Sequence, residues 1–183
     1  MAKIIAAMNM TLDGYCDHTA MSADDEIHEH YTDLLRNSDA IIYGRKTFQL
    51  MEFWPSLVKD PSGNKAMDDF AVVMDNIPKI VFSRTLKDLE WKTARLATRD
   101  LKEEVLELKQ QDGKPAMVGS PSLIVGLTKL GLIDEFQLSV HPTVVGNGLT
   151  LFKDIKDRVD LKLLNTKTFD CGAVTLYYEP AKR

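Results

Sequence analysis

The sequence Asp39-Ala-Ile-Ile-Tyr-Gly-Arg-Lys-Thr-Phe48 is the part of the chain from which a fold can be predicted most directly. Its apolar run 40–43 predicts a short strand that is buried on both faces. Gly44 ends this strand, and the residues from Thr47 to Phe53 predict a helix that stops at Trp54-Pro55. A buried strand followed at once by a helix is typical of a sheet covered by helices.

The same stretch also suggests a place where an anion binds. A strand that breaks at glycine into a helix leaves backbone N–H groups at its carboxyl end, and such groups bind anions. Arg45 adds a fixed positive charge there and Thr47 adds a hydroxyl. An ordinary strand-to-helix turn with a surface arginine explains this stretch equally well.

Strand and helix patterns alternate on both sides of this stretch, up to Gly131. Ser22 with Asp25 and Asp100 with Glu103 have the spacing of capping boxes, which predicts helix starts. The expected strands are 4–10, 79–83, a short one within 91–97, and 116–118, and the expected helices are 22–36, 65–74, 100–112 and 120–130.

The pattern changes beyond Gly131. Residues 136–140, 160–168 and 173–179 alternate between apolar and polar side chains, and Asp170-Cys171-Gly172 predicts a turn. This alternation indicates antiparallel strands. We therefore expect a single α/β domain over residues 1–183, with a mostly parallel central sheet and antiparallel C-terminal strands.

The composition excludes several classes of protein. The 183 residues carry a formal net charge of −4 without a cluster of Lys and Arg, so no nucleic-acid partner is expected. No apolar run approaches the roughly 18 residues that a membrane span needs. The N-terminal segment is interpreted as the first strand and not as a signal, which predicts a cytoplasmic protein. Cys16 and Cys171 are then expected to be free thiols.

Three junctions between a strand and the following segment carry residues suited to phosphate. They are Gly44-Arg45-Lys46-Thr47, Ser83-Arg84 and Gly119-Ser120. In a parallel sheet the carboxyl ends of the strands open on one edge, so the three junctions should lie together. Glycine-containing helix starts bind pyrophosphate, and arginine binds phosphate in a bidentate manner. We therefore predict a phosphorylated cofactor, although neither the G-x-G-x-x-G nor the P-loop pattern is present.

Several short motifs together resemble a known family. Thr11-Leu-Asp-Gly14 and Gly44-Arg-Lys-Thr-Phe48 are followed in order by Phe82-Ser-Arg84, Gly119-Ser120 and Leu132-Ile-Asp-Glu135, and then by Pro142-Thr-Val-Val-Gly-Asn-Gly148 with Leu151-Phe152. This ordered set is similar to the dihydrofolate-reductase-like family, in the branch of the reductase domain of riboflavin biosynthesis and its small stand-alone relatives. The resemblance implies a three-layer α/β fold and an NADPH-dependent oxidoreductase.

The resemblance also implies which residues bind the cofactor. In that family the first glycine turn, the Ser/Arg pair after the next strand and the glycine turn before the last helix contact NADPH. The corresponding residues here are Gly44, Arg45, Thr47, Ser83, Arg84, Gly119 and Ser120. Because Arg45 and Ser83-Arg84 offer charge and donors for a 2′-phosphate, NADPH is expected in preference to NADH.

The substrate side of the site is less well defined by the sequence. A small heterocycle or a carbonyl or imine compound is expected to lie near the first helix, where Asp25, Glu26, His28 or an ordered water would supply a proton. The alternative is that these acids only stabilise the positive end of the helix dipole. His28 and His30 lie on different sides of a helix, so no metal site is expected.

Two further functions remain possible at this stage: a module that binds a nucleotide without turnover, and a structural protein that keeps only the fold. Asp13 is interpreted as a turn residue and His141 as a structural residue. A homodimer is expected, with the alternating strands near the interface, because an apolar face or open sheet edge at that end needs to be covered.

Overall fold

The chain is organised around one eight-stranded sheet. In the computed structural model, which describes residues 1–21 and 24–181, the strands lie in the order β4-β3-β2-β5-β1-β6-β8-β7. Their bounds are β1 Ile4–Thr11, β2 Ala40–Gly44, β3 Lys79–Phe82, β4 Ala94–Leu96, β5 Ala116–Val118, β6 Glu135–His141, β7 Leu161–Thr168 and β8 Val174–Pro180.

The predicted mixture of strand directions is confirmed. Strands β1 to β6 run parallel to one another, whereas β8 is antiparallel to both β6 and β7. The expectation that all the alternating segments are antiparallel was wrong for one side of β6, because β6 pairs in parallel with β1 over Glu135–His141. Both faces of β6 are buried, with Phe136 and Leu138 on one and Gln137 and Ser139 on the other.

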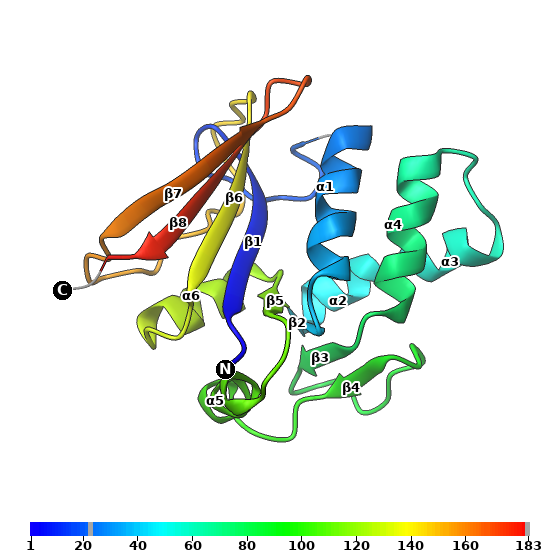
Figure 1. Ribbon diagram of the computed structural model, residues 1–183, viewed down its shortest axis with the longest axis horizontal. Helices are drawn as coiled ribbons and strands as arrows, with labels where there is room; N and C mark the ends of the chain where they lie inside the picture. Colours follow the sequence, from blue (N-terminus) through cyan, green and yellow to red (C-terminus); the bar gives the residue numbers. More distant parts are fainter. Residues whose placement is uncertain (22–23, 182–183) are drawn as a thin grey trace.

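Helices cover both faces of the sheet, as Figure 1 shows. Helices α1, α2 and α4 supply Leu35, Phe48 and Phe70 to one apolar cluster, and α5 and α6 supply Val105 and Ile124 to the other. The predicted three-layer α/β fold is thereby confirmed. The helices are α1 Asp25–Arg36, α2 Arg45–Met51, α3 Trp54–Lys59, α4 Lys65–Asn76, α5 Leu101–Gln110 and α6 Pro121–Lys129.

Several helix boundaries differ from the prediction; helix α2, for example, begins at Arg45 and not at Thr47. The Trp54-Pro55 pair begins α3 and does not end the helical region. Proline fits there because N–H groups in the first turn of a helix have no partner within the helix. The predicted N-cap Ser22 lies outside the described residues. Helix α1 begins at Asp25, and Asp24 is its N-cap, with Oδ1 accepting a hydrogen bond from Ile27 N at 3.0 Å.

Candidate functional site

Two of the three predicted junctions meet at the carboxyl edge of the sheet. Strands β2 and β5 are neighbours, and the backbone N–H of Gly44 donates a hydrogen bond of 2.9 Å to Ser120 Oγ. A Cβ atom added at Gly44 would lie 3.7 Å from Ser122 Oγ and 3.8 Å from Ser120 Oγ. The turn after β2 therefore lies directly against the turn after β5.

Gly119 makes this close approach possible. A Cβ atom at this position would lie only 2.9 Å from Cε1 of Tyr43, whose ring is buried at the end of β2. Real Cβ contacts are almost never this short, so a side chain here would displace the ring or the turn. Because it has no side chain, Gly119 lets the turn after β5 pack against the Tyr43 ring.

The hydroxyl of Ser120 does not cap its helix as the sequence pattern predicts. Ser120 occupies the N-cap position of α6, but its oxygen accepts from Gly44 N and makes no cap hydrogen bond. The residue is 1% exposed. Since its oxygen is the acceptor in this bond, the bond does not use its hydroxyl hydrogen.

The third junction lies on the outer side of β2, at the end of β3. Ser83 Oγ accepts hydrogen bonds from Thr85 N at 3.1 Å and Leu86 N at 2.9 Å, so it holds the following turn and keeps its own hydrogen free. Arg84 and Arg45 are exposed, and neither guanidinium forms a hydrogen bond or ion pair within residues 1–21 and 24–181. Thr47 is half-buried in the first turn of α2.

The electrostatics of this edge favour an anion. Neither α2 nor α6 has an acidic residue in its first turn or a side-chain cap on its N-terminal N–H groups. Arg45 and Lys46 lie in the first turn of α2 and are both exposed. Open N–H groups and uncommitted positive charges therefore lie together here.

The three residues predicted to supply a proton do not converge. Asp25 Oδ1 accepts from Asn64 Nδ2 at 2.8 Å, toward the start of α4. Glu26 Oε2 accepts from Asp170 N at 2.7 Å, toward the turn between β7 and β8. The His28 ring packs edge-on against α3 and α4, with ring centroids 5.9 Å from both Trp54 and Phe70.

A different polar group lies where β1 and β6 end. His141 Nε2 is 3.0 Å from Asn9 Oδ1, and His141 is 4% exposed. Burial lowers the pKa of His141, and the carboxylate of Asp24 opposes this shift. Asp24 also accepts a hydrogen bond from the Cys171 thiol, and its bond from Ile27 N lowers its own pKa. No motif indicates this group, because Asn9 and His141 are 132 positions apart in the chain.

Asp13 joins two loops beside this group. Its carboxylate accepts from Thr11 Oγ1 at 2.6 Å, from Val145 N at 3.1 Å and from Gly146 N at 2.8 Å. The bond from Thr11 is the main cause that lowers the pKa of Asp13. Asp13 is thus the turn residue that the sequence predicted, and it also holds the Gly146-Asn-Gly148 loop in place.

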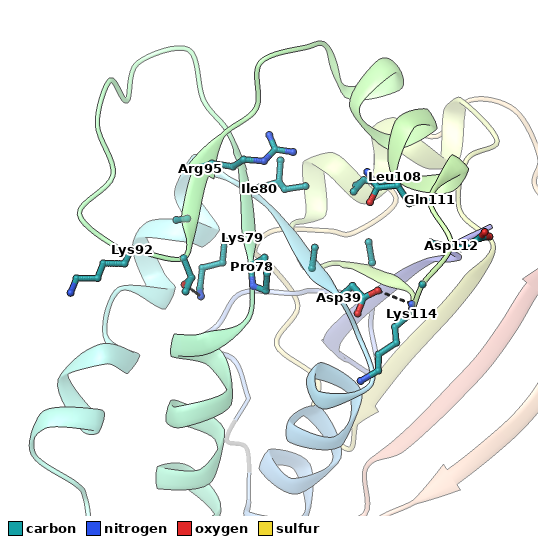
Figure 2. Close-up of a pocket in the computed structure, with 16 residues that line it drawn as sticks. Asp39, Pro78, Lys79, Ile80, Lys92, Arg95, Leu108, Gln111, Asp112 and Lys114 are labelled. Atoms are coloured by element: carbon teal, nitrogen blue, oxygen red, sulfur yellow. Dashed lines mark hydrogen bonds between the residues drawn. The ribbon is translucent and has the colours of Figure 1, made fainter.

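A hollow of about 350 Å³ lies at the opposite, amino edge of the sheet (Figure 2). It is lined by the starts of β2 to β5, and three of its cationic side chains already have partners inside the protein. Lys79 Nζ donates to Ile77 O at 2.7 Å, Lys114 Nζ donates to Arg36 O at 2.9 Å, and Arg95 pairs with Glu104. None of the predicted site residues lies here.

Neither a metal site nor a membrane-spanning helix is found in the part of the chain that the structure describes. No three His, Cys, Asp or Glu side chains are grouped so that they could hold a metal ion. No helix among these residues is long and apolar enough to cross a membrane.

Comparisons with known proteins agree with this fold. The model of the RibD C-terminal domain family matches residues 2–175. The uncharacterized protein YyaP of Bacillus subtilis is 37% identical over 180 residues, which cover 96% of this chain and 94% of that protein.

Solved structures show the same architecture at low identity. A putative riboflavin biosynthesis protein from Shewanella superposes over the full length of both chains, with a TM-score of 0.73 and 18% identity. Acinetobacter baumannii RibD superposes with a TM-score of 0.72 and 16% identity, over 99% of this chain and 58% of that one.

Proposed function

Because the chain belongs to the RibD C-terminal domain family, we propose that it is an NADPH-dependent reductase of a small heterocyclic or carbonyl/imine substrate. The observation that supports this most is the bond between Gly44 N and Ser120 Oγ. It joins the turns after β2 and β5 into one glycine-lined edge, and the uncommitted guanidinium of Arg45 lies directly beside it.

The residues at this edge fit a dinucleotide phosphate. Gly44 and Gly119 let the turns after β2 and β5 pack closely, while Ser83 and Ser120 each retain a hydroxyl hydrogen that the bonds they accept do not use. Arg45 and Arg84 supply the charge that a 2′-phosphate would require, with Thr47 beside them. When bound, NADPH supplies the hydride. The residues of the chain would hold the cofactor and orient it in one position.

The strand order gives the cofactor a direction. From Ser83-Arg84 at the end of β3, the edge passes over β2, β5, β1 and β6, with about 4.8 Å between neighbours. If the phosphates lie over β3, β2 and β5, the reactive end extends toward β1 and β6. Asn9 and His141 are at those two strand ends. We therefore place the substrate there, next to the start of α1.

Titration with NADPH tests the proposal. We expect a saturable change in cofactor fluorescence with the purified protein. Arg45→Ala and Arg84→Ala should each weaken NADPH about 10- to 100-fold, because a charge-assisted hydrogen bond contributes roughly 1.5–3 kcal/mol. Their effect on NADH should be smaller, and Lys92→Ala at the amino edge serves as the control. Equal losses for both cofactors would remove the 2′-phosphate assignment.

One observation keeps the binding module without turnover as a second candidate. Asp25 and His28 contact α4 or its N-cap and Glu26 contacts the turn between β7 and β8, and no side-chain hydrogen bond joins any two of them within residues 1–21 and 24–181. A panel that follows NADPH oxidation with pterins, the riboflavin-pathway ribosylamino-pyrimidine, quinones and simple aldehydes distinguishes the two. Saturable NADPH binding without oxidation of any compound would favour the binding module.

We also propose that the protein is a homodimer. Strand β7 is the last strand of the sheet, and residues 162–168 are exposed on both of its faces. Leu163 and Leu164, at the irregularity in the pairing of β7 with β8, are 51% and 46% exposed. A long open edge with apolar side chains is a surface that a second copy would cover. Light scattering at micromolar concentration should give twice the chain mass, and a monomer mass would refute this.

A further inference from the structure

In the structure the Asn9 amide is oriented with its oxygen toward the His141 ring. An amide oxygen only accepts hydrogen bonds, so the 3.0 Å contact requires that His141 Nε2 carry the hydrogen and donate it to Asn9 Oδ1. The amide nitrogen then points away from His141. The amide nitrogen carries two hydrogens, and it donates neither of them to a partner within residues 1–21 and 24–181.

The surroundings hold His141 firmly in this role. It is 4% exposed, and its backbone is part of the ladder between β6 and β1, where it pairs with Thr11. The charged group that faces it is the carboxylate of Asp24, from the N-terminus of α1. Asn9, in contrast, is only partly buried, two residue pairs earlier on β1, where it pairs with Ser139. The rigid imidazole therefore orients an accessible amide.

The place of this amide matches the open end of the cofactor edge. β1 lies between β5, which carries Gly119, and β6, which carries His141. Strand β1 is the direct neighbour of β5, the last strand before predicted cofactor residues; Ala6 pairs with Val118, and Asn9 lies three residues farther along β1.

We propose that Asn9 binds the acceptor atom of the substrate through its amide nitrogen, and that His141 is the residue that positions it. The proposal rests on the proposed reductase function. The acceptor is a carbonyl oxygen or an imine nitrogen bonded to the carbon that is reduced. An amide NH₂ donates to a carbonyl oxygen or a C=N nitrogen, and the substrate class that we propose is a flat, uncharged ring that carries such groups.

The step balances without a proton from either residue. The hydride brings two electrons and one hydrogen to the carbon, and NADPH is oxidised to NADP⁺. The π-bond pair of the C=O or C=N group moves to the oxygen or nitrogen, which then takes a proton from water. Asn9 donates a hydrogen bond to the atom on which negative charge develops and loses no proton.

The test uses pteridine-2,4-dione, a flat uncharged probe with ring carbonyls and C=N groups, and the full chain saturated with NADP⁺. Asn9→Ala should weaken the probe about five- to tenfold, the amount expected for one neutral hydrogen bond. His141→Phe, which fills the space without a donor, should weaken it equally. His141→Gln places an amide donor near Nε2 and should restore binding to within about threefold of the natural chain. Asn76→Ala, in the exposed end of α4, is the matched control.

Two further measurements distinguish failure of the roles proposed for Asn9 and His141 from failure of the proposed reductase function. All four variants should bind NADPH as the natural chain does, and the Asn9 side-chain NH₂ signals in a ¹⁵N–¹H spectrum should shift when the probe is added. NADPH binding with no probe binding, or equal probe affinity in Asn9→Ala, would overturn the role of Asn9 alone. A glutamine variant no better than the phenylalanine variant would overturn the positioning role of His141. Absence of NADPH binding would instead refute the reductase function on which the inference rests.

Discussion

The two edges of the parallel sheet differ in what their polar groups are free to do. At the amino edge there is a hollow of about 350 Å³, but Lys79, Arg95 and Lys114 in its wall are bonded to the protein itself. At the carboxyl edge Arg45 and Arg84 have no partner among the residues that the structure describes. The depth of a hollow is therefore a poorer guide to a binding site than the availability of donors and charges.

Chain direction explains much of this difference. Parallel strands followed by helices bring the helix N-termini to the carboxyl edge, where their N–H groups remain open. At the amino edge the chain returns from helices, and its loops close on the strands. Lys114 N donates to Asp39 Oδ2 at 2.7 Å, which ties the loop before β5 to the start of β2. The amino edge thereby contributes to stability, and we assign binding to the carboxyl edge.

The largest expected effect concerns Lys79 at the amino edge. Burial lowers its pKa to about 8 from 10.5, so between pH 8 and 10.5 the unfolded chain binds a proton that the folded chain does not. The buried Lys79 ammonium lowers the free energy of unfolding. This effect is fully present below pH 8 and is lost as the pH rises to 10.5. The free energy of unfolding should rise by about 3 kcal/mol over this window relative to Lys79→Met.

Urea titrations at several pH values measure this difference. Arg84→Met at the carboxyl edge should show no such dependence, because that guanidinium is exposed. If the natural chain and Lys79→Met had parallel pH profiles, the amino-edge charge would not be buried as described.

The next effect compares one glycine from each edge. A Cβ atom at Gly119 would press on Tyr43, and one at Gly113 would overlap the Asp39 carboxylate. Both Gly119→Ala and Gly113→Ala should lower the free energy of unfolding by about 1–3 kcal/mol. Only Gly119→Ala should weaken NADPH, by about tenfold or more, in a fluorescence titration. A similar loss of NADPH affinity in both would show that the edges are not functionally distinct.

A smaller effect is expected when one hydroxyl is removed from each region. Ser120→Ala leaves Gly44 N without its acceptor, which should cost about 1–2 kcal/mol and weaken NADPH severalfold. Ser38→Ala, just before β2, removes the bond from its hydroxyl to Leu34 O but should leave NADPH affinity unchanged. Denaturant titration and cofactor titration of both variants check this. Unchanged affinity in Ser120→Ala would mean that the bond is structural only.

The smallest expected effect concerns the first turn of α1. Asp25→Asn should lower stability by only about 0.3–1 kcal/mol, through loss of a charge near the helix N-terminus, and should leave NADPH affinity unchanged. Glu26→Gln should behave alike, since both acids are exposed. If either one lowered turnover about 100-fold on an accepted substrate, that residue would be the proton donor that the sequence predicts.

Local patterns predicted most of the elements but not every role within them. The run 40–43 with Gly44 gave the correct strand end, and the capping pair at Asp100 gave the correct start of α5. The Trp54-Pro55 pair was misinterpreted as a helix stop, because proline is disfavoured inside a helix but fits the first turn, and here it begins α3. Ser120 was correctly placed, but its hydroxyl bonds across to Gly44 instead of along its own helix.

The sequence by itself determined the order of strands and helices, the glycine turns and the family, because these depend on periodicity and on neighbouring residues. The tertiary structure alone decided which side chains face one another. Asn9 meets His141 because β1 and β6 become neighbours although many elements separate them in the chain. Asp25 and Glu26 are adjacent in sequence, yet Asp25 bonds to Asn64 and Glu26 to Asp170, because successive helical residues are turned by about 100°. Contacts of this kind depend on strand order and helix rotation, which no local pattern contains.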